Sequence, residues 1–272
     1  MTRRDTYTHG HHPTVLANHS WRTAENSVRY LLPHLEAGQR LLDVGCGPGT
    51  ITLDLAERVA PGEVIGVDNV EDVVAVAETN RAERGVANAS FRVADVYSLD
   101  FEDDSFDVVQ AHQVLQHLSD PVAALAEMRR VCRPGGLVAV RESDYAGFLW
   151  APLDPRLTRW LELYHEVARG NDAEPDAGRF LLGWAQQAGF DDISPSASVW
   201  CFANDVDRRW WGGTWAERIK VSAFAEQAVG RGLATRAELD DISAAWSKWS
   251  ESADGWFAVV HGEILCRVSP ST

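Results

Sequence analysis

Apolar residues along the chain alternate between short continuous runs and positions spaced as on one face of a helix. Five runs have the length of strands, and the segments between them place apolar residues three or four positions apart. The runs lie at 40–44, 63–68, 90–96, 106–111 and 137–141, and the helix-spaced segments at 50–59, 70–84 and 121–131. Nearly continuous apolar strands that alternate with helices indicate an α/β protein with a buried, mostly parallel sheet.

The pattern changes after Ala146, where large apolar side chains become frequent. The segments expected there are a loop and helix over 148–164, a helix at 179–188, a strand at 193–203, two helices within 205–252 and a last strand at 256–268. A further helix is expected before the first strand, at 21–35, with Pro33 near its end. We predict that 205–252 is a helical cap inserted between strands six and seven, rather than an independent domain.

The stretch from Asp43 to Thr50, DVGCGPGT, has the features of a ligand-binding turn. Its alternate glycines let the backbone turn sharply and approach a ligand, and the helix after it presents unpaired N–H groups. Asp68 ends the next strand, where a carboxylate can accept hydrogen bonds from ribose hydroxyls. The spacing differs from the dinucleotide fingerprint G-x-G-x-x-G. A carboxylate at Asp43 would repel a pyrophosphate but suits a ligand that carries a cationic amine and a sulfonium.

This segment resembles motif I of the class I S-adenosylmethionine (SAM) methyltransferases, closest to the ubiquinone/menaquinone-type and small-molecule natural-product enzymes. Later motifs follow in the family's order, and the resemblance covers residues 21–200. It implies a Rossmann-like sheet of seven strands, mostly parallel, with an antiparallel last strand placed beside the fifth. It also implies a SAM-binding core at 21–204 and 253–272, SAM as the cofactor and S-adenosylhomocysteine as the product.

The resemblance assigns cofactor contacts residue by residue. It implies that Asp95 accepts from adenine N6, that the N–H of Val96 meets adenine N1, and that carbonyls around Ala111 hold the amino group of the methionine moiety. Asn69 stands where the family often has an apolar residue or serine. The predicted cofactor-binding residues are Asp43, Gly45, Cys46, Gly47, Asp68, Asn69, Asp95, Val96, Ala111 and Tyr7.

Residues 1–20 are polar and contain four histidines. In related methyltransferases the corresponding segment folds over the cofactor pocket, so we expect Tyr7 and His11 to help close the site. A disordered tail is the alternative. The irregular spacing of the histidines does not favour a metal site, and we predict no metal.

The resemblance also locates the acceptor side of the site. Methyl transfer needs an acceptor held in line with the C–S bond and shielded from water. A base is needed when that acceptor is a hydroxyl or a carbon acid. His112, after the fourth strand, and Tyr145, after the fifth, are the predicted catalytic residues, with Asp144 beside them. His117 is predicted to be structural.

Composition and charge exclude several classes of partner. A net charge of −15 without a basic run argues against nucleic acid and anionic membranes. The four cysteines show no C-x-x-C spacing, which favours reduced thiols over a disulfide framework or a zinc site. No apolar run reaches transmembrane length, and the first residues lack the apolar core of a signal peptide. We expect a cytoplasmic monomer or homodimer that acts on a small molecule.

Tryptophan content is the one signal for the acceptor. The chain has eleven tryptophans, and most of them follow residue 149. Aromatic rings often build the walls of small-molecule pockets, which predicts a bulky, largely apolar or aromatic metabolite as acceptor, through O, N or C. The alternative is that these rings only join the cap to the core. Two other functions stay open, a SAM-binding enzyme that catalyses a non-methylating reaction such as cyclisation, and a nicotinamide-dependent oxidoreductase, which the glycine spacing disfavours.

Overall fold

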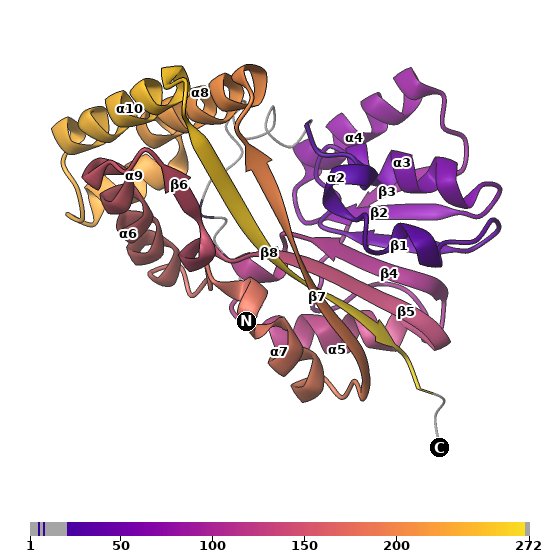
Figure 1. Ribbon diagram of the computed structural model, residues 1–272. Coiled ribbons are helices and arrows are strands. Elements are labelled where there is room, and N and C mark those ends of the chain that lie inside the picture. The colour runs from indigo at the N-terminus through magenta and orange to yellow at the C-terminus, as the bar shows by residue number, and fades with distance from the viewer. Residues whose placement is uncertain (1–4, 6–7, 9–20, 270–272) are drawn as a thin grey trace.

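The structure, a computed structural model, describes residues 5, 8 and 21–269. These residues form one eight-stranded sheet in the order β3-β2-β1-β4-β5-β8-β6, and β7 pairs with the other edge of β8 (Figure 1). The strands are β1 (Leu41–Val44), β2 (Val64–Asp68), β3 (Ala89–Val93), β4 (Phe106–His112), β5 (Cys132–Ser143), β6 (Leu149–Ala151), β7 (Asp192–Phe202) and β8 (Trp256–Arg267). The predicted parallel arrangement of the first five strands is confirmed.

Helices cover both faces of this sheet. The helices of the core are α2 (Ala24–Ser27), α3 (Thr50–Val59), α4 (Glu71–Arg84), α5 (Pro121–Val131) and α7 (Leu181–Gln187). Successive strand residues point to opposite faces, so Leu41 packs in the cluster that contains α2 and α3, while Leu42 packs in the cluster that contains α5 and α7. The sheet is therefore buried from both sides, as its continuous apolar strands predict.

β8 holds the two halves of the molecule together. It runs antiparallel to β5, with Ser143 opposite His261, and antiparallel to β7 along its whole length. This confirms the predicted antiparallel last strand beside the fifth. The three-residue strand β6, which pairs with the beginning of β8, was not predicted. It is too short to give a periodic signal.

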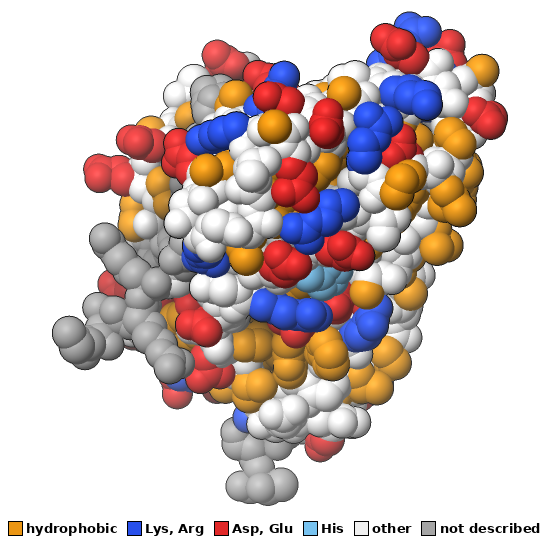
Figure 2. Space-filling model, turned by 90° about the vertical axis from the view of Figure 1, so that its left-hand side faces the viewer, with side chains coloured by type: hydrophobic (Ala, Val, Ile, Leu, Met, Phe, Trp, Pro, Cys, Tyr) orange, Lys and Arg blue, Asp and Glu red, His pale blue; other side chains and the backbone are white. Residues whose placement is uncertain are grey.

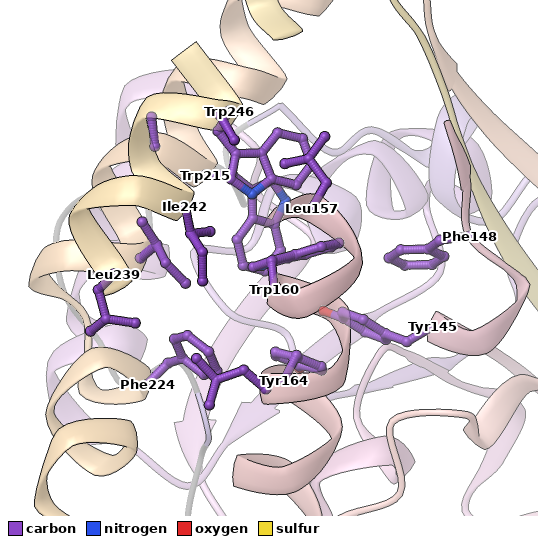
Figure 3. Packing of buried hydrophobic residues seen from close by; sticks show 14 of the residues in the cluster. Tyr145, Phe148, Leu157, Trp160, Tyr164, Trp215, Phe224, Leu239, Ile242 and Trp246 are labelled. Atoms are coloured by element: carbon purple, nitrogen blue, oxygen red, sulfur yellow. The ribbon is translucent and has the colours of Figure 1, made fainter. Parts of the chain in front are cut away.

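The cap is larger than predicted. Residues 205–252 form three helices rather than two, α8 (Asp205–Val221), α9 (Ala223–Gly230) and α10 (Arg236–Glu251), and α6 (Pro155–Arg169) packs with them. Their shared core is aromatic: the ring of Trp160 lies 4.6 Å from that of Trp215 and 4.9 Å from that of Trp246, all nearly fully buried (Figure 3). Phe257 of β8 completes this core.

The helix predicted at 21–35 is wrong as a single element. The chain forms the one-turn α2 and then a 3-10 turn, η1 (Leu32–His34), with Val28 between them in a non-helical conformation at φ −132°. Thr23 and Asn26 form a capping box that starts α2. Pro33 lacks an N–H and stands at the start of η1, so the apolar spacing continues while the helix does not.

The side of the cap that faces the viewer in Figure 2 has no single sign of charge. Acidic and basic side chains lie intermixed there, over the elements at the left of Figure 1. Arg159 of α6, for example, lies within ion-pair distance of three carboxylates, those of Glu162, Glu166 and Glu238. This face therefore lacks the basic patch that nucleic-acid binding requires.

Candidate active site

A cavity of about 450 Å³ lies at the carboxyl ends of the parallel strands. Residues that end or follow β1, β2, β3 and β4 line it, together with residues of β7 and α8. Ligands of open α/β sheets bind at this edge, and the volume is in the usual range for small-molecule sites. This cavity is the candidate active site.

The glycine turn after β1 is fixed by its neighbours in the structure. Gly45, Gly47 and Gly49 have φ values of 68°, 53° and 80°, which disfavour any side chain. The N–H of Gly45 donates to the carbonyl of Val67 at 2.8 Å. A Cβ at Gly45 would lie 2.3 Å from Cγ2 of Val114. Packing within the protein therefore already excludes a side chain at Gly45, whether or not a ligand is bound. Gly45, Cys46 and Gly47 all line the cavity.

Asp43 lines the cavity and is almost fully buried. Its two carboxylate oxygens accept hydrogen bonds from the hydroxyl of Thr52 and the side-chain amide of Gln110. Burial raises the pKa of Asp43 to about 7, although both hydrogen bonds oppose the rise. The predicted acid is thus present at the cavity, but part of its hydrogen-bonding capacity is used within the protein.

Asp68 ends β2 and is tied to the glycine turn. Its carboxylate accepts from the N–H of Gly47 and from the N–H of Val70, each at 3.2 Å. Asn69, Asp95 and Val96 line the cavity beside it. Eight of the ten predicted cofactor-binding residues therefore line the cavity. They are Asp43, Gly45, Cys46, Gly47, Asp68, Asn69, Asp95 and Val96.

The other two predicted cofactor residues have different outcomes. Ala111 is fully buried inside β4 and is not among the described residues that line the cavity; its neighbours Gln110 and His112 are. Tyr7 and His11 lie outside the described residues. Asp5, from the same segment, does line the cavity, where its carboxylate accepts from the hydroxyl of Tyr97 at 2.8 Å.

Both predicted catalytic residues line the cavity. His112 is 4% exposed, and its ring centroid lies 5.6 Å from that of Trp200. The ring of Tyr145 is stacked between those of Tyr164, at 4.0 Å, and Phe148, at 4.5 Å. Figure 3 shows Tyr145 between these two rings, at the edge of the aromatic core.

Two nearby polar residues have other environments. Asp144 forms a two-pronged ion pair with Arg179, at 2.7 and 2.5 Å, and accepts from the N–H of Gly147. It is not among the described residues that line the cavity, and its place near the transferred methyl stays a prediction. Burial lowers the pKa of His117 to about 3, which keeps this imidazole neutral at physiological pH.

Gln113 was not predicted and lines the cavity. It follows β4 with φ at 55°, an unfavourable conformation for a residue with a side chain. Its amide oxygen accepts from Arg22 at 2.5 Å, and its amide nitrogen lies 2.7 Å from the hydroxyl of Ser143 and 2.9 Å from Nε2 of His261. One side chain thus connects the N-terminal part of the core, β5 and β8.

Glu142 binds the backbone of the three residues that follow Gln113. It is fully buried in β5, and its carboxylate accepts from the backbone N–H groups of Val114, Leu115 and Gln116, at 2.9, 2.8 and 3.3 Å. These three residues begin the 3-10 turn η2 (Leu115–His117) and line or adjoin the cavity. Burial raises the pKa of Glu142 to about 7 against these hydrogen bonds.

Part of the cavity lining is aromatic. Phe148, Trp200, Trp211 and Trp215 belong to it, and Val259 and Arg218 line the cavity as well. All four of these aromatic residues also belong to the core cluster of the cap, with Trp246 and Trp249, which do not line the cavity among the described residues. Packing in the cap core is thus common to all of these tryptophans, and only some of them also reach the cavity.

Three other sequence predictions concern features of the whole chain. Among the residues that the structure describes, no group of three or more His, Cys, Asp or Glu side chains is arranged to hold a metal ion. All four cysteines carry free thiols. None of the described helices is both long and apolar enough to cross a membrane.

Comparison with known proteins gives consistent similarities. A family model described as a methyltransferase domain matches residues 35–196. An uncharacterized methyltransferase of Schizosaccharomyces pombe is 38% identical to this chain over 275 residues, which cover 96% of each protein. The ubiquinone/menaquinone biosynthesis C-methyltransferase UbiE of Bdellovibrio bacteriovorus is 37% identical over 46% of this chain and 51% of its own. Among solved structures, the cyclase SpnF matches 95% of this chain and 82% of its own, with a TM-score of 0.53 and 25% identity.

Proposed function

The chain belongs to the SAM-dependent methyltransferases, and we propose that it methylates a small, bulky acceptor that is largely apolar or aromatic. The observation that carries this proposal is the mixed lining of the cavity. Glycines and carboxylates line it at the strand ends, and the rings of Phe148, of Trp200 on β7 and of Trp211 and Trp215 on α8 line it as well. A polar, charged cofactor fits the first group of residues, and an apolar acceptor fits the second.

The residues at the strand ends fit SAM. We assign Asp68 to the ribose hydroxyls, because its carboxylate ends β2 at the cavity. Asp95 and Val96 are assigned to the adenine edge, and the backbone of Gly45 to Gly47 to the methionine part. SAM supplies an electrophilic methyl group on its sulfonium. The protein supplies the placement of the acceptor and the exclusion of water.

His112 and Tyr145 are assigned to the acceptor. His112 takes the proton from a hydroxyl or carbon acid, since its imidazole lines the cavity at the end of β4. The hydroxyl of Tyr145 orients the acceptor, because stacking against Tyr164 and Phe148 holds its ring in place. An amine acceptor would need no base, so the effect of removing His112 also reports on the acceptor atom.

A second function, cyclisation without methyl transfer, is favoured by one observation. The cyclase SpnF matches nearly the whole chain, including the cap, at 25% identity. In a reaction of that kind SAM would be bound but not consumed. We keep methyl transfer as the proposed function because the full-length relative in Schizosaccharomyces pombe is named a methyltransferase. The free thiols support a reducing compartment, and we propose the cytoplasm.

The experiment incubates the protein with SAM and a panel of quinones, phenolic polyketides and indoles. S-adenosylhomocysteine release is measured together with the product mass. We expect S-adenosylhomocysteine and a product in which one methyl group replaces one hydrogen. An isomer of the substrate formed with SAM intact would instead support cyclisation. If only small polar amines are methylated, the proposed acceptor class is wrong.

The matched variants are His112→Ala and Trp211→Phe, with wild type as reference. Loss of turnover in His112→Ala with unchanged SAM affinity supports the assigned base. Trp211 lines the cavity and stacks on Phe202 at 4.4 Å, so phenylalanine retains much of the packing while shortening the wall. We expect a higher acceptor KM in Trp211→Phe with little change in SAM affinity.

A further inference from the structure

The turn that carries Tyr145 is tied to a segment 30 residues later in the chain. This 3-10 turn, η3 (Tyr145–Gly147), follows β5. The N–H of Tyr145 donates to the carbonyl of Pro175 at 3.2 Å, and the N–H of Ala146 donates to the carboxylate of Asp176 at 2.7 Å. The second of these bonds depends on a side chain, so a substitution at Asp176 alters it.

The carboxylate of Asp176 is shared between η3 and α6. Asp176 is 5% exposed, and the oxygen that accepts from Ala146 also lies 2.8 Å from Nε2 of His165. The other oxygen accepts from Arg169 of α6 at 3.1 Å. A carboxylate this buried needs donors to remain charged. Burial raises the pKa of Asp176, but the hydrogen bonds from His165 and Ala146, with the nearby positive charges, outweigh it and hold that pKa below its usual value.

Both ring nitrogens of His165 face oxygen atoms that only accept. Nδ1 lies 2.8 Å from the carbonyl oxygen of Leu161, one turn earlier in α6, and Nε2 faces the ionised carboxylate of Asp176. A neutral imidazole has a single N–H, whereas an imidazolium donates from both nitrogens. The two contacts are therefore both hydrogen bonds only when His165 is charged. Burial lowers the pKa of His165, but the hydrogen bonds to Asp176 and Leu161 outweigh it, so this pKa lies above its usual value.

The other charged groups near this pair are carboxylates and guanidinium groups. They are Glu162, Glu166 and Arg169 on α6, Glu174 and Arg179 beside Asp176, and Asp144, which pairs with Arg179. His165 keeps 15% of its side chain exposed, in a surface hollow that Ala146 also lines, so water reaches the imidazole. Histidine is the residue type that ordinarily changes its charge between pH 5 and 8, so in this set of described residues His165 is the group that responds to pH in that range.

We propose that the ion pair of His165 and Asp176 positions Tyr145 for the acceptor, and that this positioning weakens when His165 loses its proton. The charged pair keeps the carboxylate at the N–H of Ala146, which fixes the backbone next to Tyr145. A neutral imidazole keeps at most one of its two hydrogen bonds, so it holds the carboxylate less firmly. Neither His165 nor Asp176 is among the described residues that line the cavity, so both are positioning residues. The inference rests on the proposed function, which assigns Tyr145 to the acceptor.

The first measurement needs no variant. Nuclear magnetic resonance of the wild-type chain follows the ring of His165 and the backbone amide of Ala146 between about pH 5 and pH 9. We expect one shared midpoint above 6.5, the ordinary value for histidine, with an imidazolium ring below it. Separate midpoints, a shared midpoint at or below 6.5, or an Ala146 amide that does not respond to the titration of His165 overturn the proposal.

The second measurement compares wild type with His165→Gln and Asp176→Asn, each of which removes the ion pair. His34→Gln is the matched control, since His34 is an exposed histidine of η1. Hydrogen exchange of the η3 amides is followed by mass spectrometry at about pH 6 and about pH 8.5. Because the charged pair is complete at the lower pH and lost as the pH rises through the raised pKa of His165, exchange in His165→Gln should be about fivefold faster than in wild type at the lower pH.

At the higher pH this ratio should approach one, and Asp176→Asn should also exchange faster than wild type at the lower pH. The control should match wild type at both pH values. A ratio for His165→Gln that is the same at both pH values shows a merely structural role and overturns the proposal. Wild-type exchange rates in Asp176→Asn at the lower pH also overturn it.

Acceptor kinetics give the functional readout. The probe is the compound of the acceptor panel that wild type turns over fastest, at saturating SAM. The acceptor KM of His165→Gln should exceed that of wild type by about fivefold at the lower pH and approach it at the higher pH, with unchanged SAM affinity. A KM ratio independent of pH, or a change confined to SAM affinity, contradicts the positioning of Tyr145.

Failure to fold and failure of the proposed function have separate signatures. S-adenosylhomocysteine affinity and the thermal midpoint report on the fold of each variant, and the resonance titration uses wild type alone. If SAM remains intact with every compound of the panel, the proposed function fails. The resonance and exchange results still decide whether the ion pair of His165 and Asp176 holds η3.

Discussion

The side-chain amide of Gln113 lies 2.9 Å from Nε2 of His261, a residue 148 positions later in the chain. An amide nitrogen can only donate, so the imidazole accepts at Nε2 and carries its proton on Nδ1. Burial, with the charge of Arg141 in second place, holds the pKa of His261 well below its usual value. A neutral histidine thus fixes Gln113 at the candidate active site, and a charged one would break the contact.

The backbone of Gln113 offers a test of this fixation. Gln113→Ala and Gln113→Gly both remove the contacts with Arg22, Ser143 and His261. With φ at 55°, however, alanine retains the strain, whereas glycine relieves about 1 kcal/mol of it. We expect both variants to unfold more easily than wild type, and Gln113→Gly to be the more stable of the two by about 1 kcal/mol. Urea denaturation measures the difference, and the reverse order would show that the left-handed backbone carries no strain.

Asp68 should be the strongest single contributor to SAM affinity. Replacing a carboxylate that accepts from ribose hydroxyls removes charge-assisted hydrogen bonds, so Asp68→Ala should weaken SAM binding about tenfold to a hundredfold. Calorimetry measures the dissociation constant. The control is Asp72→Ala, an exposed acid in the first turn of α4. Equal SAM affinity in wild type and Asp68→Ala would rule out the ribose assignment.

Gly45 should tolerate no methyl group for two separable reasons. Its positive φ disfavours alanine by about 1–2 kcal/mol, and the new Cβ would overlap with the side chain of Val114 at 2.3 Å. We expect Gly45→Ala to lose SAM binding and stability. In the double variant Gly45→Ala/Val114→Ala, the stability lost through the overlap should be recovered. The stability lost through the positive φ should not be. Thermal unfolding of the two single variants and the double variant gives the coupling, and strict additivity would contradict the overlap.

Glu142 predicts a pH dependence of stability. Its pKa rises from 4.5 to about 7 on folding, so the folded protein binds this proton more tightly than the unfolded chain does. The free energy of unfolding therefore falls as the pH rises from 4.5 to about 7, by up to about 3 kcal/mol from this group.

Glu142→Gln removes this pH dependence of stability and leaves all other titrating groups in place. The stability of wild type relative to Glu142→Gln should thus be greatest near pH 4.5 and smallest above pH 7. Denaturant unfolding at several pH values measures the difference, in which the other titrating groups cancel. A difference that stays constant across this range would mean that Glu142 folds with its usual pKa.

The parts of the fold that were predicted correctly are those with local signals. α3 and α5 begin and end where the apolar spacing predicts, and Asp120 caps α5 with a hydrogen bond to the N–H of Ala123. The acids near the carboxyl ends of β1, β2 and β3 reach one cavity because parallel strands end at a common edge. Their positions in the sequence, with the family resemblance, were therefore enough to bring them together.

The parts that were missed depend on contacts between distant segments. Gln113 contacts His261 on β8, which is distant in the sequence, and no local sequence pattern predicts a glutamine with a positive φ. In the sequence, Arg218 looks like any polar residue near the end of a helix. Only the packing of α8 shows that it lines the cavity. The ion pair of Asp144 was not expected because its partner, Arg179, lies 35 residues later. Apolar spacing at 21–35 likewise could not show that the helix ends at Val28.

The position of β8 has a consequence for how the protein is made. This strand leaves the ribosome after every other strand described, yet it lies between β5 and β7 and carries Phe257 into the cap. Until residue 267 has been synthesised, β5 and β7 each have an unpaired edge, and unpaired edges favour aggregation. The nascent chain therefore completes its sheet only after translation of this strand, and a chaperone that shields open strand edges would be needed most just before that point.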